Sequence, residues 1–167
     1  MEVSVRSTAL LVAALALLAL GSDTGLSQNF ATQSVTVAVS AVAKISVSGN
    51  PGALTITDGP IGTDALTSVS DASTTYSITH NSATNKRITA SLDATLPAGF
   101  TLQAALGSNK GTPSGSTTIP AGSAVNLVTG IARGADAGRT ITYTFSALAS
   151  AGTLPSTTRT VTLTLTD

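Results

Sequence analysis

The stretch Gln33-Ser-Val-Thr-Val-Ala-Val-Ser-Ala-Val-Ala-Lys-Ile-Ser-Val-Ser48 places an apolar residue at every odd position from Val35 to Val47. Because successive side chains of an extended chain point to opposite faces, this alternation predicts a β-strand with one apolar face. Strands in globular proteins usually span roughly three to ten residues. The stripe is longer than a single strand of a sandwich normally is, so we expect a first strand that pairs beyond its own domain.

Residues 1–28 have the pattern of a secretory signal peptide. A short polar start with Glu2 and Arg6 precedes the almost wholly apolar run Ala9–Leu20, and small residues follow it. The run is shorter than the roughly 20 apolar residues that a membrane span needs. We therefore expect cleavage near Ser27 or Gln28 and a secreted, extracellular or cell-surface protein that keeps no membrane span.

The composition favours β structure and association. Charged residues make up 10% of the chain, the formal net charge is zero and cysteine is absent, whereas about 25% of an ordinary soluble domain is charged. A net charge near zero promotes association. A nucleic-acid-binding domain would carry a basic patch, and Lys86-Arg87 is the only adjacent basic pair. We therefore expect no nucleic-acid partner.

After the opening stripe, short alternating segments are separated by corners rich in Gly, Pro, Asn and Asp. The expected strands are residues 53–57, 74–80, 86–92, 100–106, 117–119, 124–131, 139–148 and 156–166. Such spacing indicates an all-β fold, here an Ig-like antiparallel β-sandwich of about seven to nine strands.

The division of the chain follows from these segments. We expect a signal peptide at residues 1–28, an extended N-terminal donor strand at 29–42 and the sandwich domain at 43–167. Within the domain, we expect segments 74–80 and 86–92 to form a hairpin, residues 107–116 to form a long exposed loop, and residues 133–138 to form a second loop.

No pattern of catalytic or cofactor-binding residues emerges. The single histidine, His80, lies at an expected strand end beside a polar loop, where we predict a solvated side chain, and the chain has no G-x-S-x-G elbow. Zinc sites need clusters of His, Cys or carboxylate ligands. Asp58, Asp64 and Asp71 fall in expected turns. We therefore predict that the protein is not an enzyme and uses no cofactor and no metal.

The N-terminal stretch lacks the usual protection of a strand edge. Edge strands are commonly guarded by Lys or Pro, and Val35–Ala43 contains neither. If the segment fills a groove of a neighbouring subunit, Val35, Val37, Val39 and Ala41 are the inserted side chains at the subunit interface. Each copy then donates to one neighbour and accepts from another, and such a contact propagates into a filament. This predicts a secreted structural subunit that self-associates into a pilus-like homopolymer.

A second interpretation remains open. Residues 33–48 can form one bent strand, or two strands, inside a monomeric sandwich. The protein would then be a cell-surface domain that binds carbohydrate or another protein through its loops, chiefly Gly107–Ser116. Both interpretations predict the same local pattern.

Three segments carry a resemblance to a known family. The order of Ser34–Ser48, the strand Thr75-Tyr-Ser-Ile-Thr79 and the end Leu154-Pro-Ser-Thr-Thr-Arg-Thr-Val-Thr-Leu-Thr-Leu-Thr166 resemble the spore coat protein U and Csu-type pilin domain family. Members are secreted Ig-like sandwiches, and several assemble by donor-strand exchange. The chain lacks the cysteines common in that family. The resemblance implies export machinery as a partner, with a chaperone as one option, and a chaperone-independent filament of the TasA-like kind fits the same residues.

Overall fold

The computed structural model describes residues 29–167, so the predicted signal peptide lies outside the described residues. The chain divides into two units after Ala38. Residues 29–38 of the first unit are exposed and belong to no helix or strand. Between residues 29 and 167, no helix is long and apolar enough to cross a membrane.

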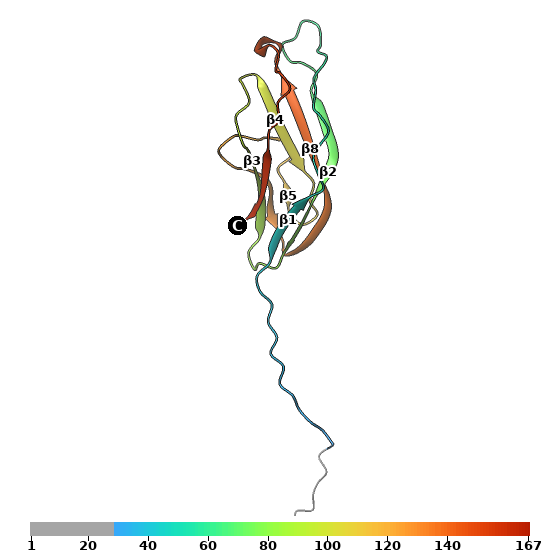
Figure 1. Cartoon of the computed structure of the whole chain (residues 1–167), viewed down its shortest axis with the longest axis vertical. Helices are drawn as coiled ribbons and strands as arrows, with labels where there is room; N and C mark the ends of the chain where they lie inside the picture. Colours follow the sequence, from blue (N-terminus) through green and yellow to red (C-terminus); the bar gives the residue numbers. More distant parts are fainter. Residues whose placement is uncertain (1–28) are drawn as a thin grey trace, which may run out of the picture. The chain divides into compact units, whose positions relative to one another are not determined.

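The second unit is a β-sandwich of two antiparallel sheets (Figure 1). The five-stranded sheet has the order β1-β2-β8-β4-β6, with bounds β1 Ala43–Val47, β2 Val69–His80, β8 Gly134–Ala147, β4 Phe100–Leu106 and β6 Thr117–Thr118. The four-stranded sheet has the order β5-β7-β3-β9, with bounds β5 Thr112–Pro113, β7 Val125–Ile131, β3 Lys86–Leu92 and β9 Val161–Thr166. A short 3₁₀ turn, η1, covers Ala149–Ala151. The predicted all-β sandwich fold is confirmed.

Alternate residues of the strands form one core between the sheets. Tyr76 and Ile78 of β2 and Ile88 and Ala90 of β3 are fully buried, as the period of two predicts. The other buried hydrophobic residues are Leu92, Ala104, Leu106, Ile119, Leu127, Val128, Ile131, Ile141, Tyr143 and Ala147. Cross-sheet packing of these residues accounts for the stability of a chain that has no disulfide.

The solvated position predicted for His80 is wrong. Its side chain is 1% exposed, and its Nε2 lies 3.1 Å from the carbonyl oxygen of Ala132. The inner face of β2 continues to its last residue because β8 begins opposite it, at Gly134. Residues 133–138 are therefore not the predicted loop either, since all but the first belong to β8.

The predicted hairpin of segments 74–80 and 86–92 is also wrong. β2 pairs with β1 and β8, whereas β3 pairs with β7 and β9 in the other sheet. Alternation determines which face of a strand is apolar but not which neighbour it pairs with. The connection at residues 81–85 therefore crosses from one sheet to the other.

Candidate functional site

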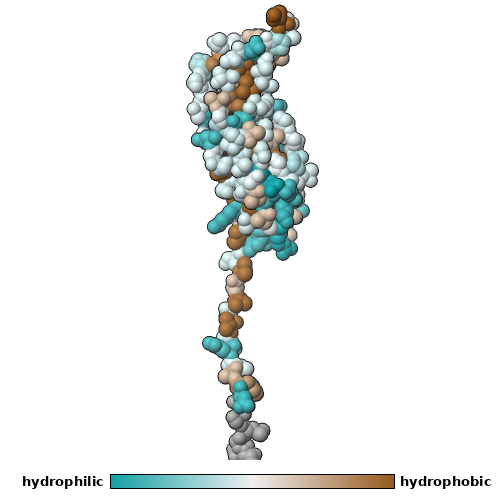
Figure 2. Space-filling model, turned by 90° about the vertical axis from the view of Figure 1, so that its right-hand side faces the viewer, coloured by the Kyte–Doolittle hydropathy of each residue, from teal (hydrophilic) through white to brown (hydrophobic). Residues whose placement is uncertain are grey.

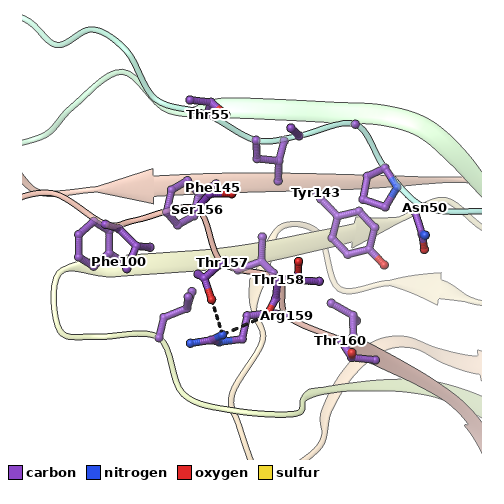
Figure 3. Close-up of a pocket in the computed structure, with 18 of the residues that line it drawn as sticks. Asn50, Thr55, Phe100, Tyr143, Phe145, Ser156, Thr157, Thr158, Arg159 and Thr160 are labelled. Atoms are coloured by element: carbon purple, nitrogen blue, oxygen red, sulfur yellow. Dashed lines mark hydrogen bonds between the residues drawn. The ribbon is translucent and has the colours of Figure 1, made fainter.

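An apolar groove of about 1050 Å³ opens between the two sheets of the domain. Its floor is the inner face of β4 and β8, with Phe100, Leu102, Tyr143 and Phe145 among its residues. Figure 3 shows Phe100 and Phe145 towards one end of the groove and Tyr143 with Asn50 towards the other. The rings of Phe100 and Phe145 stack, with centroids 6.2 Å apart and planes inclined by 7°. We call this feature the acceptor groove.

The large side chains of the acceptor groove are incompletely covered. Phe100, Leu102 and Phe145 are only partly buried, whereas Leu106 and Ile141 on the same two strands are buried. The other partly buried apolar residues of the groove are Ile45, Leu54, Ile56, Leu66, Leu96, Leu154, Val161 and Leu163. Figure 2 shows hydrophobic side chains that remain visible between polar ones on the surface of the domain. Covering such area is favourable by about 25 cal/mol per Å².

Two segments outside the strands form the rims of the groove, residues 49–57 and residues 153–159 (Figure 3). Within the described chain, no backbone–backbone hydrogen bond involves either segment. The Gly52 N–H donates to Asp71 Oδ2 at 3.3 Å, and Arg159 Nη1 donates to the Thr158 carbonyl at 3.0 Å. The remaining N–H and C=O groups of both rims are open for pairing.

Residues 53–57, predicted to form a strand, lie on one of these rims. The prediction is wrong, because these residues form no strand in the structure. Leu54 and Ile56 are partly buried towards the groove while Thr55 and Thr57 are exposed, as in a half-buried strand. No strand in the described part of the chain pairs with this segment, although every other residue contributes to an apolar face. The segment has the side-chain pattern of a strand without a partner.

Three polar groups of the groove wall lack a hydrogen-bond partner within residues 29–167. The Thr74 Oγ1 and Arg159 Nε are buried and unpaired, and no hydrogen bond involves the Tyr143 hydroxyl. Thr74 is 4% exposed and pairs with Ile141, two residues from Tyr143. Burial raises the pKa of Tyr143 above its ordinary value of 10.0, so the hydroxyl remains a donor. Buried groups without a partner, as at Thr74 Oγ1 and Arg159 Nε, are unusual in a protein core.

The predicted interface residues fall on both sides of the unit boundary. Val35 and Val37 lie in the first unit and are 75% and 85% exposed, and Val39, the first residue of the domain unit, is 88% exposed. Figure 2 shows hydrophobic side chains recurring along this N-terminal segment. Single exposed apolar residues are normal on protein surfaces. A regular series of three exposed valines forms a continuous apolar stripe, and exposing such a stripe to water is unfavourable.

Asn81 fixes the chain directly after this stripe. Its Nδ2 donates to the Ser40 carbonyl at 2.8 Å, its Oδ1 accepts from the Val42 N–H at 2.7 Å, and its own N–H donates to the Val42 carbonyl at 3.1 Å. Ala41, the fourth predicted interface residue, therefore lies within a stretch held by its own domain. Sequence reasoning missed Asn81, because nothing distinguishes it from the other polar residues of the loop at 81–85.

The loop at residues 107–116, on which the second interpretation depends, is held to the domain. Asp136, 4% exposed, accepts hydrogen bonds from Ser108 Oγ at 2.9 Å and from the Asn109 N–H at 2.8 Å. Its other carboxylate oxygen lies 2.9 Å from Arg139 Nε. The end of the loop contains β5, which pairs with β7. This buried charge is fully paired and has a structural role.

The side chains of the aspartates in the expected turns accept hydrogen bonds from backbone N–H groups. Asp64 accepts from the Ser150 N–H and hydroxyl, each at 2.8 Å, and Asp58 accepts from the Gly59 N–H at 2.8 Å. A hydrogen bond from Ser73 lowers the pKa of Asp71. In the part of the chain that the structure describes, no three His, Cys, Asp or Glu side chains lie close enough to hold a metal ion.

Comparison with known proteins adds no relative. No family model, no curated protein and no solved structure matches this chain.

Proposed function

We propose that the protein is a structural subunit of an extracellular filament, and that the N-terminal segment of one copy fills the acceptor groove of the next. The observation that carries this proposal is the coincidence of two incomplete features in one chain. One is an apolar groove whose rims have backbone groups without a backbone partner among residues 29–167. The other is an exposed segment with valines at alternate positions.

The two features match chemically. A strand laid between the rims would pair its N–H and C=O groups with residues 49–57 or 153–159, as in β-strand addition. Its alternate side chains would enter the groove, and Val35, Val37 and Val39 are spaced for this. Ala41 forms the junction with the donor's own domain, because Asn81 holds the residues on either side of it.

The free energies involved indicate that stable insertion needs both the burial of the valine side chains and the backbone hydrogen bonds. Three buried valines contribute several kcal/mol at roughly 25 cal/mol per Å² of apolar area. Association costs about 4–15 kcal/mol in translational and rotational freedom. Insertion of the side chains alone therefore leaves little net affinity, and the backbone ladder, at about 0.5–1.5 kcal/mol per hydrogen bond, must add to it.

The mode of assembly follows from the difference between the two surfaces. The donor segment and the acceptor groove are distinct parts of the chain, so the contact is heterologous and leaves one of each free at the ends. Repetition gives a filament or, if the geometry closes, a ring. The formal net charge of zero does not oppose such repetition.

A matched pair of substitutions tests the proposal. Val37→Asp places a charge on the face that enters the groove, whereas Thr36→Asp places the same charge on the opposite face. Light scattering after size-exclusion chromatography should show monomers for Val37→Asp and high-mass species, rising with concentration, for wild type and Thr36→Asp. The proposal fails if Val37→Asp still polymerises, or if the wild-type protein is monomeric as the loop-binding interpretation requires.

A further inference from the structure

One polar side chain interrupts the apolar face of the N-terminal segment. Alternate positions from Ala31 to Ala41 carry alanine or valine, with the single exception of Gln33. In an extended strand Gln33 points to the same side as Val35 and Val37. A glutamine inserted among apolar side chains needs hydrogen-bond partners, because a buried amide without them costs about 1–3 kcal/mol.

The acceptor groove contains unpaired groups of the complementary kind. Among residues 29–167, Arg159 Nε is a buried donor without an acceptor, and Thr74 Oγ1 is a buried hydroxyl oxygen without a partner. The Tyr143 hydroxyl lines the same groove and makes no hydrogen bond to any of the residues that the structure describes. A glutamine amide offers one acceptor oxygen and an NH₂ group with two donors, so it can serve donors and acceptors together.

We propose that Gln33 sets the register of the inserted strand by hydrogen bonding to the unpaired groups of Arg159, Thr74 and Tyr143 in the groove of the next copy. This inference rests on the proposed function and adds to it a specificity-determining residue. A slip of two residues keeps an apolar face in the groove, so the valines alone define the register weakly. After such a slip, the Gln33 amide would lie among apolar side chains. The polar groups of Arg159, Thr74 and Tyr143 would then be covered by the inserted strand without gaining hydrogen-bond partners.

A single buried polar residue fixes the register of helical coiled coils, and Gln33 would act on the same principle in strand insertion. Its effect here is discrimination between registers, because a register without the amide contact leaves the buried Arg159 Nε and Thr74 Oγ1 unsatisfied, together with the Tyr143 hydroxyl. We expect the correct register to be favoured at least tenfold over a register shifted by two residues.

Disulfide trapping tests this in the full chain, which has no cysteine of its own. A Val35→Cys copy is mixed with copies that carry one cysteine along the groove, at Leu54, Phe145, Val161 or Leu163. Mass spectrometry counts the mixed disulfides after mild oxidation. With Gln33 present, one groove position should give at least ten times the yield of the others.

The same scan is then repeated with Gln33→Val in the donor copy, and with Ser34→Val as the matched control on the opposite face. Gln33→Val should spread the disulfides over two or more groove positions, and Ser34→Val should leave the preference unchanged. Arg159→Met in the acceptor copy should reduce the preference as Gln33→Val does, and the two together should reduce it no further.

The outcomes separate the inference from the function on which it rests. If one groove position dominates equally with and without Gln33, the inference is overturned and strand insertion stands. If Val35→Cys forms no disulfide with any groove position, although each variant unfolds cooperatively, strand insertion itself fails and the inference fails with it.

Discussion

Asn81 joins the domain to the residues that follow the valine stripe, through hydrogen bonds from both ends of its amide. We predict that Asn81→Ala leaves the Val42 N–H without its side-chain acceptor and the Ser40 carbonyl without its donor. Amide exchange at Val42, measured by NMR in the Val37→Asp background, should then accelerate several-fold. The loss in unfolding free energy should be about 1–2 kcal/mol, since each bond contributes roughly 0.5–1.5 kcal/mol.

The control for this substitution comes from the same loop. Asn85 is exposed, and its side chain makes no hydrogen bond among the described residues, so Asn85→Ala should change neither quantity. Equal exchange at Val42 in both variants would mean that Asn81 does not hold the chain at this point.

At the scale of strands, alternation predicted faces and boundaries well where polar corners bound a segment. β3 covers residues 86–92, and β4 covers 100–106, as expected. Segment 53–57 has an equally good pattern and is no strand, because a ladder depends on a neighbour that the local sequence does not specify. The acceptor groove was not predictable for the same reason: it forms where Leu54, Phe145 and Leu163, far apart in the chain, meet at an uncovered part of the core.

The end of β9 is tied to the start of β3 by a carboxylate whose effect depends on pH. Asp167 Oδ1 accepts from Lys86 Nζ at 2.5 Å and from Thr84 Oγ1 at 3.0 Å. The hydrogen bond from Lys86 is the main cause that lowers the pKa of Asp167 below its ordinary 3.8. A carboxylate with a lowered pKa in the folded state stabilises the protein fully above its unfolded pKa, and this contribution is lost as pH falls through the folded value.

We therefore predict that Asp167→Asn destabilises the domain at neutral pH and that the difference from the parent disappears at strongly acidic pH. Urea denaturation of both proteins in the Val37→Asp background at about pH 7, 4 and 2 measures it. Asp93→Asn is the control, because among the described residues the Asp93 carboxylate accepts only a local hydrogen bond, from the Ala94 N–H. A difference that stayed constant down to the lowest pH would exclude the Lys86 contact as its source.

At the scale of the whole molecule, the donor segment and the acceptor groove each have their own residues, so they can be disabled separately. Val37→Asp disables the donor and leaves the groove intact. Leu163→Asp places a charge on the groove side of β9, where Leu163 is partly buried, and leaves the donor intact. A charge in an apolar groove opposes insertion because the carboxylate loses its hydration without gaining a partner.

Each variant alone should be monomeric, and an equimolar mixture should give a one-to-one dimer and nothing larger. In that dimer the intact donor of Leu163→Asp occupies the intact groove of Val37→Asp, and the two disabled surfaces prevent any further step. Sedimentation velocity measures the masses.

Thr36→Asp mixed with Leu163→Asp is the control and should retain longer species, because Thr36→Asp keeps both its donor segment and its acceptor groove. Leu54→Asp on the groove rim replaces Leu163→Asp if the latter does not unfold cooperatively. A mixture that remains monomeric would show that the valine face and the groove do not recognise each other.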